Sequence, residues 1–449
     1  MMYVATKPIR AFKAAPPVPP AEPASVATDL AAFVAIDWAD QKHQVLLQPA
    51  DSPRKESLVL EQKPEAIADW LAQLKQRFGE RKIAVILEQS RGPLISALLP
   101  QGNLVLYPIN PKTSAKLREA FYPSGSKNDP LDAGLMLDML LAHRDRLRAW
   151  QPDDATTRQL HLLTESRRRF VADQVRLTNR LTSALKSYYP QALELAGQDL
   201  SRPMACAFVQ QWPTWEAARK AKPQQLRKFY YAHGCRSEEK IQERLQLLAQ
   251  GQALTTDAAI LGAQSLLTRS VARELAVLPG IINEYDRQIE ALFKAHVDYA
   301  LWDSFPGAGP ALGPRLAAAW GTQRERFAEA QAMSAFSGIA PVKEQSGQST
   351  FIHMRLGCPK FQRQTFHEFT ACSLRGCLWA RCCYELLLER GKGHHAAVRA
   401  VGLKWQRIMF RCWQTRTPYD EAKYVESLRH NSPVLYARIL AAQQAARTS

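Results

Sequence analysis

The apolar run Lys82–Leu87 (KIAVIL) is the feature that most constrains how this chain folds. An uninterrupted apolar segment of this length is typical of a central strand that helices cover on both faces. An amphipathic helix precedes the run, because Pro64 suits a first helical turn and Gly79 suits a helix end. The chain is therefore expected to contain an α/β domain.

The segments around this run predict the order β-β-β-α-β-α-β-α. Strands are expected at Ala32–Asp37, His43–Gln48, Ser57–Leu60, Lys82–Leu87 and Leu104–Tyr107, with helices starting at Pro64, Pro93 and Pro111 and another over Pro130–Ala142. Three antiparallel strands followed by alternating strands and helices is the order of the ribonuclease H fold, although many α/β domains share parts of it. We assign residues 31–150 to this α/β domain.

The rest of the chain predicts helices. Six prolines in the first thirty residues indicate a disordered Pro/Ala-rich tail over residues 1–30. A heptad-like apolar spacing over Ala155–Pro190 indicates a long helix, and a second long helix, about Thr256–Val297, is interrupted at Pro279-Gly280. Residues 151–300 are thus expected to form a coiled-coil arm with short helices between, and residues 301–449 a mostly helical C-terminal domain.

Charge and composition restrict the class of protein and the kinds of molecule that it can bind. The 449 residues carry 59 Lys+Arg against 42 Asp+Glu, a net charge of +17, and 46% hydrophobic residues exclude disorder of the whole chain. No stretch approaches the roughly 20 apolar residues of a membrane span, and the start lacks a secretory apolar core, which predicts a cytoplasmic protein. The positive excess favours nucleic acid over an uncharged partner, unless the charges are simply solvated.

The cysteines agree with a reducing compartment, since none forms a Cys-x-x-Cys pair. We expect them to be small buried hydrophobic residues. The eight are Cys206, Cys235, Cys358, Cys372, Cys377, Cys382, Cys383 and Cys412.

Four carboxylates stand at the ends of predicted elements in the α/β domain. Asp37 closes the first strand, and Glu88 closes the Lys82–Leu87 strand. Asp129 and Asp132 lie at i and i+3 on the start of a helix. Acidic groups that converge on one spot repel each other unless cations sit between them, and hard oxygen ligands suit Mg²⁺ or Mn²⁺.

A structural interpretation of each carboxylate is also open. Asp37 can be a turn residue and Glu88 an exposed strand end. Taken alone, Asp129 before Pro130 is a good N-cap, and Asp132 in the first turn suits the helix dipole. The two interpretations are compatible, because a helix start can hold ligands in place.

These motifs carry a resemblance to a known family. Asp37 in AIDWADQKH, Glu88 in ILEQSRG and the run KNDPLDA resemble the DEDD transposases of the insertion-sequence family one-ten, relatives of the Piv DNA invertase. Their first domain is similar to the Holliday-junction resolvase RuvC. The resemblance implies that Asp37, Glu88, Asp129 and Asp132 are catalytic metal ligands for Mg²⁺ or Mn²⁺, and that Lys127 contacts phosphate.

A serine in the C-terminal domain carries the second part of the resemblance. Ser346 is predicted in a loop before Gly347, and a lone loop serine is usually a solvated turn residue. The stretches SGIAPV, CPKFQRQTFHEF, GKGHHAAVRAV and KWQRIMFRCWQ are similar to the C-terminal transposase domain of the same family. The resemblance implies that Ser346 is a nucleophile that forms a phosphoserine linkage with DNA; Ser349 is the second candidate. The long arm is expected to bring the two halves together, within one chain or between subunits.

Basic residues gather near this serine. Lys343–Arg416 holds 13 Lys/Arg and four Asp/Glu, about half of the positive excess. In one predicted helix, Val401, Trp405, Ile408 and Cys412 make an apolar stripe, so Trp405 is expected in the core rather than as a stacking platform. The residues expected to contact nucleic acid are Arg355, Lys360, Arg363, Arg399, Lys404, Arg407 and Arg411.

Together these features predict a Mg²⁺-dependent transposase or site-specific recombinase that acts on element ends and target DNA. The resemblance further implies a guide RNA encoded by the element, a homodimer or homotetramer, and association with the nucleoid of a prokaryote. Two alternatives remain: a junction-resolving nuclease that uses only carboxylates and water, and a catalytically silent nucleic-acid-binding remnant.

Overall fold

The computed structural model describes residues 30–88, 92–122, 129–347 and 349–448. The chain divides into two compact units, Met1–Pro152 and Asp153–Ser449. The predicted Pro/Ala-rich tail lies outside the described residues, apart from its last position.

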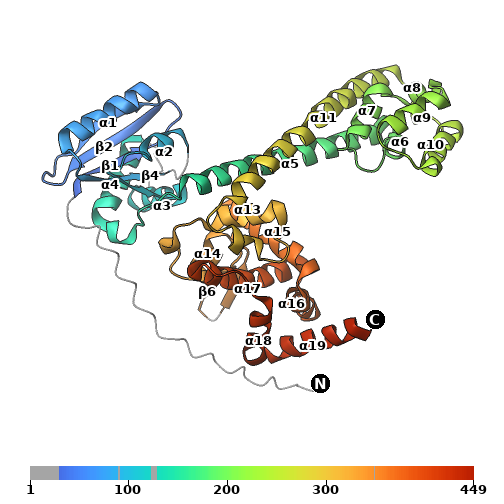
Figure 1. Ribbon diagram of the computed structural model, residues 1–449. Helices are drawn as coiled ribbons and strands as arrows, with labels where there is room; N and C mark the ends of the chain where they lie inside the picture. The colour runs from blue at the N-terminus through green and yellow to red at the C-terminus, as the bar shows by residue number, and fades with distance from the viewer. Residues whose placement is uncertain (1–29, 89–91, 123–128, 348, 449) are drawn as a thin grey trace. The chain divides into compact units, whose positions relative to one another are not determined.

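The N-terminal unit contains a mixed five-stranded sheet (Figure 1). Its strands are β1 (Leu30–Asp37), β2 (Lys42–Pro49), β3 (Glu56–Glu61), β4 (Lys82–Leu87) and β5 (Leu104–Pro108). The spatial order is β3-β2-β1-β4-β5, in which β1, β2 and β3 are antiparallel and β4 and β5 run parallel to β1. The predicted order of strands and helices along the chain, β-β-β-α-β-α-β-α, is confirmed.

Helices cover both faces of this sheet because successive side chains of a strand point to opposite sides. Val85 packs in one core with Trp70, and its neighbour Ala84 packs in the other with Met136. The helices are α1 (Pro64–Phe78), α2 (Pro93–Leu98), α3 (Pro111–Phe121) and α4 (Asp129–His143). Residues of α1 and α2 fill the first core, and residues of α4 fill the second. This architecture fits a ribonuclease H-like domain.

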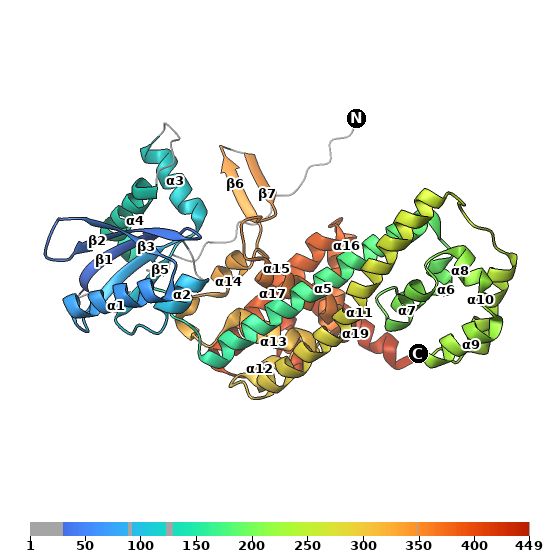
Figure 2. The same cartoon turned by 90° about the horizontal axis from the view of Figure 1, so that it is seen from above.

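The second unit is almost entirely helical. Its helices are α5 (Ala155–Tyr188), α6 (Ala192–Leu195), α7 (Pro203–Gln211), α8 (Trp215–Lys220), α9 (Pro223–Ala232), α10 (Glu238–Gln250), α11 (Ala258–Lys294), α12 (Tyr299–Asp303), α13 (Gly309–Trp320), α14 (Ala330–Phe336), α15 (Lys360–Gly376), α16 (Leu378–Glu389), α17 (His394–Thr415), α18 (Glu421–Asn431) and α19 (Pro433–Thr448). Helices α5 and α11 lie side by side, and α6–α10 gather at one end of the pair (Figures 1 and 2). The supercoil of a coiled coil stays a prediction.

The predicted break at Pro279-Gly280 is wrong, because α11 continues through both residues. An internal proline removes one backbone hydrogen bond and crowds the preceding turn. Leu275, Leu278 and Ile282, which flank the proline, are buried, the first two in the core that α11 shares with α5. Packing against the neighbouring helix therefore outweighs the local preference of Pro279.

The start of α5 is joined to the loop after α13 and to His296 by polar contacts. Asp154 caps α5 by accepting from the backbone N–H and the hydroxyl of Thr157 (2.9 and 2.6 Å), and Thr322 donates to the same carboxylate (2.8 Å). Burial would raise the pKa of Asp154, but these hydrogen bonds outweigh it and lower the pKa to about 2. The Thr157 hydroxyl also meets the buried His296 ring (2.9 Å).

In the part of the chain that the structure describes, no helix is long and apolar enough to cross a membrane. The eight cysteines carry free thiols. Four of them are buried as expected, but Cys372 is exposed. The expectation of burial is wrong there because α15 buries the face that carries Phe366, Phe369 and Ser373, and Cys372 lies outside it.

Candidate active site

Two of the predicted carboxylates leave the sheet at the ends of adjacent strands. Asp37 is the last residue of β1, and Glu88 follows Leu87, the last residue of β4. The two strands are parallel, and Ile36 lies opposite Leu87. The next residue on each strand, Asp37 and Glu88, therefore emerges at the same edge of the sheet. The carboxyl edge of parallel strands is where α/β sheets commonly place their sites.

Helix α3 links Glu88 to a third carboxylate, Asp132. Ser114 donates a hydrogen bond to Oε1 of Glu88, and Nη1 of Arg118 lies 2.6 Å from Oδ2 of Asp132. Asp132 is 5% exposed, and its Oδ1 is buried without a hydrogen-bond partner among the described residues. The sheet register thus places Asp37 beside Glu88, and α3 holds Glu88 and Asp132.

Two further residues predicted for the site lie wholly or partly outside what the structure describes. Asp129 begins α4, but its side chain lies outside what the structure describes. Lys127 falls in the segment 123–128, which is also outside the described residues. The roles of both residues stay predictions.

The donor set at this edge fits a hard divalent cation. Carboxylate oxygens are the ligands that Mg²⁺ and Mn²⁺ prefer, and a buried carboxylate oxygen without a partner is costly unless a cation or donor reaches it. Oδ1 of Asp132 is such an atom. No group of three or more His, Cys, Asp or Glu is arranged to hold a metal within the described residues, a set that leaves out the side chain of Asp129.

Ser346 lies at the tip of a β-hairpin, and the loop predicted for it is wrong. Strand β6 (Val342–Ser346) ends at this serine, and β7 (Ser349–His353) begins at the second candidate. Gly347 has φ = +58°, the left-handed conformation that a tight hairpin turn requires. Ser346 and Ser349 pair in the last rung, so both side chains point to the same side of the hairpin, and both are exposed. Figure 2 shows the hairpin projecting from the helices of its unit.

The segment after the hairpin is held by Arg363. Its Nη2 donates to the carbonyl oxygens of Arg355 (2.8 Å) and Leu356 (2.6 Å), and its Nε lies 3.0 Å from Sγ of Cys358. Arg363 was expected to contact nucleic acid, and these bonds give it a structural role. Arg355 is half-buried, with an Nε atom that has no partner in the described part of the chain.

Helix α17 presents both a core face and a basic face. Trp405 is buried and donates from Nε1 to Oγ of Ser373 (2.9 Å), which confirms that it is a core residue. Arg407 and Arg411 are exposed, as is Lys360 at the start of α15, whereas Arg399 and Lys404 are half-buried. The exposed side chains can reach a phosphate backbone without leaving the fold.

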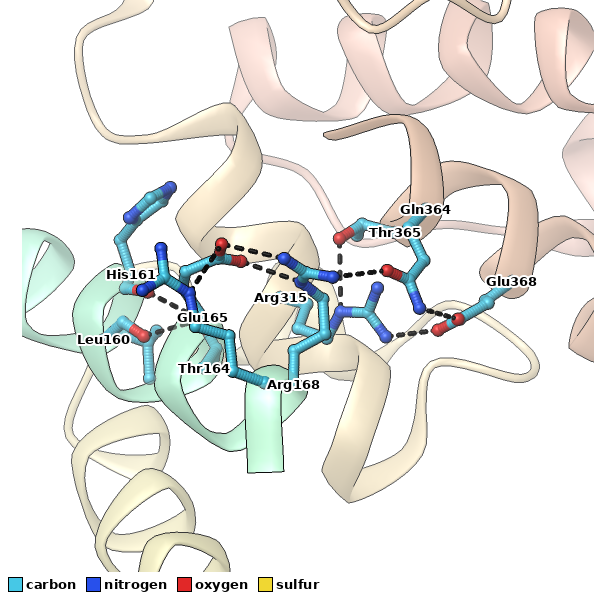
Figure 3. A network of polar contacts seen from close by, with 10 residues as sticks. Leu160, His161, Thr164, Glu165, Arg168, Arg315, Gln364, Thr365 and Glu368 are labelled. Carbon is cyan, nitrogen blue, oxygen red and sulfur yellow. Dashed lines mark hydrogen bonds and ion pairs between the residues drawn. The ribbon is translucent and has the colours of Figure 1, made fainter. Parts of the chain in front are cut away.

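Arg168 of α5 is used inside the fold. Arg168 binds the carboxylate of Glu165 at 2.8 Å and reaches Oε1 of Gln364 on α15 at 2.9 Å (Figure 3). Arg315 on α13 continues the network, because it contacts Glu368 and lies 3.2 Å from Oγ1 of Thr365. The network fixes α5 to the C-terminal helices. Arg168 therefore has structural partners, Glu165 and Gln364, that the sequence did not reveal.

Two family models match the parts of the chain that carry these sites. The model of DEDD transposases of the IS110 type, described as a transposase, matches residues 34–190. The model described as the transposase IS116/IS110/IS902 family matches residues 299–383. The chain belongs to the IS110 family of transposases. It is accordingly a DNA transposase, and the predicted family is confirmed.

The alignments with three related proteins cover most of the chain. The mini-circle putative transposase for IS117 of Streptomyces coelicolor is 27% identical over 403 residues, 88% of this chain and 96% of the relative. The uncharacterized 44.8 kDa protein of insertion element IS116 of Streptomyces clavuligerus is 26% identical over 322 residues, 71% and 78% of the two chains. The uncharacterized 42 kDa protein of IS900 of Mycobacterium paratuberculosis is 26% identical over 341 residues, 73% and 81%.

Sequence reasoning missed Ser114 and Arg118, although it found the carboxylates that they contact. Both lie on α3, one turn apart, in the segment that the DEDD family model matches. The available signal was weak, because a serine and an arginine at i and i+4 on a helix occur often at solvated surfaces.

Proposed function

We propose that the transposase cuts and rejoins DNA with a divalent metal held by the DEDD carboxylates and with Ser346 as the nucleophile. The observation that carries the proposal is the arrangement of Asp37, Glu88 and Asp132. The first two leave adjacent strand ends, and α3 holds the second and third. Two carboxylates at one edge of a sheet, and a third held by the helix that contacts one of them, suit metal-assisted work on phosphates in a net basic protein.

In this proposal Asp37, Glu88, Asp129 and Asp132 hold Mg²⁺ or Mn²⁺. The bound cation would polarise the scissile phosphate and favour loss of the proton from the attacking hydroxyl. The buried Oδ1 of Asp132, which has no hydrogen-bond partner among the described residues, supports this assignment, because a bound cation would contact this oxygen. The protein's own contribution is to fix the carboxylates in place before DNA arrives.

Ser346 supplies the covalent step. Its Oγ bonds to phosphorus, its proton passes to a base, and the bond from phosphorus to one deoxyribose oxygen breaks, leaving a free strand hydroxyl. In rejoining, the hydroxyl of another strand end attacks the phosphoserine, and Oγ of Ser346 leaves with a proton. One phosphoester bond forms for each that breaks, so no ATP is required. The exposed hairpin tip supports this role, because a duplex can approach Ser346 without displacing the core.

The nucleic-acid partners are element ends, target DNA and a guide RNA encoded by the element. The proposed phosphate contacts in the C-terminal unit are Lys360, Arg399, Lys404, Arg407 and Arg411, with Arg355 and Arg363 at the base of the hairpin. Lys127 is the proposed contact beside the carboxylates. Because strand exchange joins four DNA ends, we propose that a homodimer or homotetramer acts on them, in association with the nucleoid.

A cleavage assay with four variants tests this proposal. Full-length protein, co-purified RNA, Mg²⁺ and end-labelled element DNA are incubated, and strand cleavage is followed on denaturing gels. Asp37→Asn, Asp132→Asn and Ser346→Ala are each expected to abolish cleavage, and Ser349→Ala to retain it. Cleavage by Ser346→Ala would favour a nuclease that uses water. No cleavage by the wild type with either metal would favour a silent nucleic-acid-binding protein.

A further inference from the structure

Helix α3 presents two polar side chains to two carboxylates that come from different elements. Ser114 and Arg118 are separated by four residues, so they lie on one face of the helix, one turn apart. Ser114 meets Glu88, which follows β4, and Arg118 meets Asp132 on α4. One helix face therefore touches two of the proposed metal ligands.

Both contacts lie in surroundings where water competes poorly. Ser114 is 5% exposed, and besides its contact with Glu88 its Oγ lies 3.1 Å from the carbonyl oxygen of Pro111. The ion pair of Arg118 and Asp132 has side chains that are 23% and 6% exposed. A buried carboxylate without a counter-charge is strongly destabilising, whereas exposed pairs contribute little. The ion pair of Arg118 and Asp132 is thus structurally costly to remove, unlike an ordinary surface pair.

The contacts also divide the oxygens of Asp132 into two kinds. Arg118 holds Oδ2, and Oδ1 is buried with no partner in the described residues. A guanidinium that forms an ion pair with one oxygen fixes the orientation of the carboxylate and leaves the other oxygen free to bind a cation.

We propose that α3 is the positioning element of the metal site. Ser114 fixes the orientation of Glu88, and Arg118 is the built-in counter-charge of Asp132 that leaves Oδ1 for the metal. This inference rests on the proposed metal site, and it assigns roles to Ser114 and Arg118 as positioning residues that act through the carboxylates.

Substitution of Ser114 is expected to weaken metal binding, whereas substitution of Arg118 is expected to lower the stability of the metal-free protein. Ser114→Ala changes no charge and frees Glu88 to rotate, so it should weaken Mn²⁺ binding about 10-fold or more, the usual effect of losing a residue that orients a metal ligand. Arg118→Gln leaves Asp132 buried without a counter-charge. It should lower the melting temperature of the metal-free protein, and Mn²⁺ should then raise that temperature more than it does in the wild type.

The test uses the full-length chain and Mn²⁺ alone as the probe. Bound Mn²⁺ is measured by calorimetry and by electron paramagnetic resonance, and thermal unfolding is recorded with and without the metal. Ser96→Ala, an exposed serine on α2, is the control for Ser114→Ala. Lys116→Gln, an exposed cation on α3, is the control for the lost charge of Arg118→Gln. Arg118→Lys keeps the charge and should retain most of the metal-free stability.

The outcomes separate this inference from the proposed metal site. If the wild type binds Mn²⁺, Asp132→Asn abolishes binding, and Ser114→Ala and Arg118→Gln behave like their controls, the positioning role is refuted while the metal site stands. If Asp132→Asn leaves binding unchanged, or the wild type binds no Mn²⁺, the metal site and this inference both fail.

Discussion

Replacing His43 should destabilise the N-terminal unit by about 2 kcal/mol, because this side chain makes two hydrogen bonds in a fully buried position. Its Nδ1 accepts the backbone N–H of Ala39 at 3.2 Å, and its Nε2 donates to Oε1 of Gln62 at 2.7 Å. A net hydrogen bond contributes about 1 kcal/mol. His43→Leu removes both bonds at similar volume. Ala39 stands two residues after Asp37, so the lost bond also loosens the segment that follows this carboxylate.

Two further variants separate the contributions of the two hydrogen bonds of His43 to stability. Asn at this position places an acceptor near Nδ1 and keeps the bond from Ala39, whereas Gln places a donor near Nε2 and keeps the bond to Gln62. Each should lose about 1 kcal/mol, half the loss of His43→Leu. Hydrogen exchange followed by mass spectrometry measures the opening free energy of the peptides over residues 30–62 in the full-length chain.

The same bonds make the N-terminal unit sensitive to acid. Nδ1 must keep its lone pair to accept from Ala39, and burial lowers the pKa of His43 below its usual value of 6.5. Between the lowered pKa of the folded chain and the usual value of 6.5, the unfolded chain therefore binds a proton that the folded chain does not. In that window stability falls as the pH falls, by at most about 1.4 kcal/mol per pH unit. His43→Leu should remove this part of the slope. An unchanged exchange rate in His43→Leu, or an unchanged dependence of stability on pH, would show that the two hydrogen bonds of His43 do not stabilise this unit.

Other substitutions test the packing and the basic face. Gly321 has φ = +70°, and a Cβ atom there would lie 2.4 Å from Oδ1 of Asp153, so Gly321→Ala should cost about 2 kcal/mol or more in a denaturant titration of the C-terminal unit. Gly280 lies inside α11 with open space around an added Cβ atom, so Gly280→Ala should instead stabilise the same unit by about 0.5–1 kcal/mol. Equal effects of the two substitutions would contradict the different surroundings of these glycines. Arg407→Gln and Arg411→Gln should each weaken DNA binding and lower the slope of log affinity against log salt by about 1, measured by fluorescence anisotropy; unchanged slopes would remove these residues from the interface.

The sequence predicts the α/β domain well because its signals are local. In β4, the residues that alternate between the two cores are all apolar, which already indicates a strand covered on both faces. The placement of Asp37 and Glu88 follows from the order of the strands, since parallel neighbours end at one edge. Prolines and glycines at helix ends mark the boundaries, as Pro64 and Gly79 do for α1.

What the sequence does not predict depends on contacts between distant segments. Ser114 and Glu88 are 26 residues apart, so their contact is visible only in the folded chain. The hairpin was missed because both of its strands are exposed on both faces, apart from Val342, and show no alternation of apolar and polar residues. The helix through Pro279 was missed because packing of α11 on α5 overrides a local preference.

The chemical identity of the protein–DNA linkage decides whether Ser346 is the nucleophile. Wild-type transposase is incubated with Mg²⁺, co-purified RNA and element-end DNA, denatured, and digested with protease and nuclease, and the nucleotide-bearing peptide is sequenced by mass spectrometry. We expect a nucleotide on Ser346 that is absent from Ser346→Ala and from Asp132→Asn. A nucleotide on Ser349, or DNA cleavage with no peptide-bound nucleotide, would contradict the assignment of Ser346 as the nucleophile.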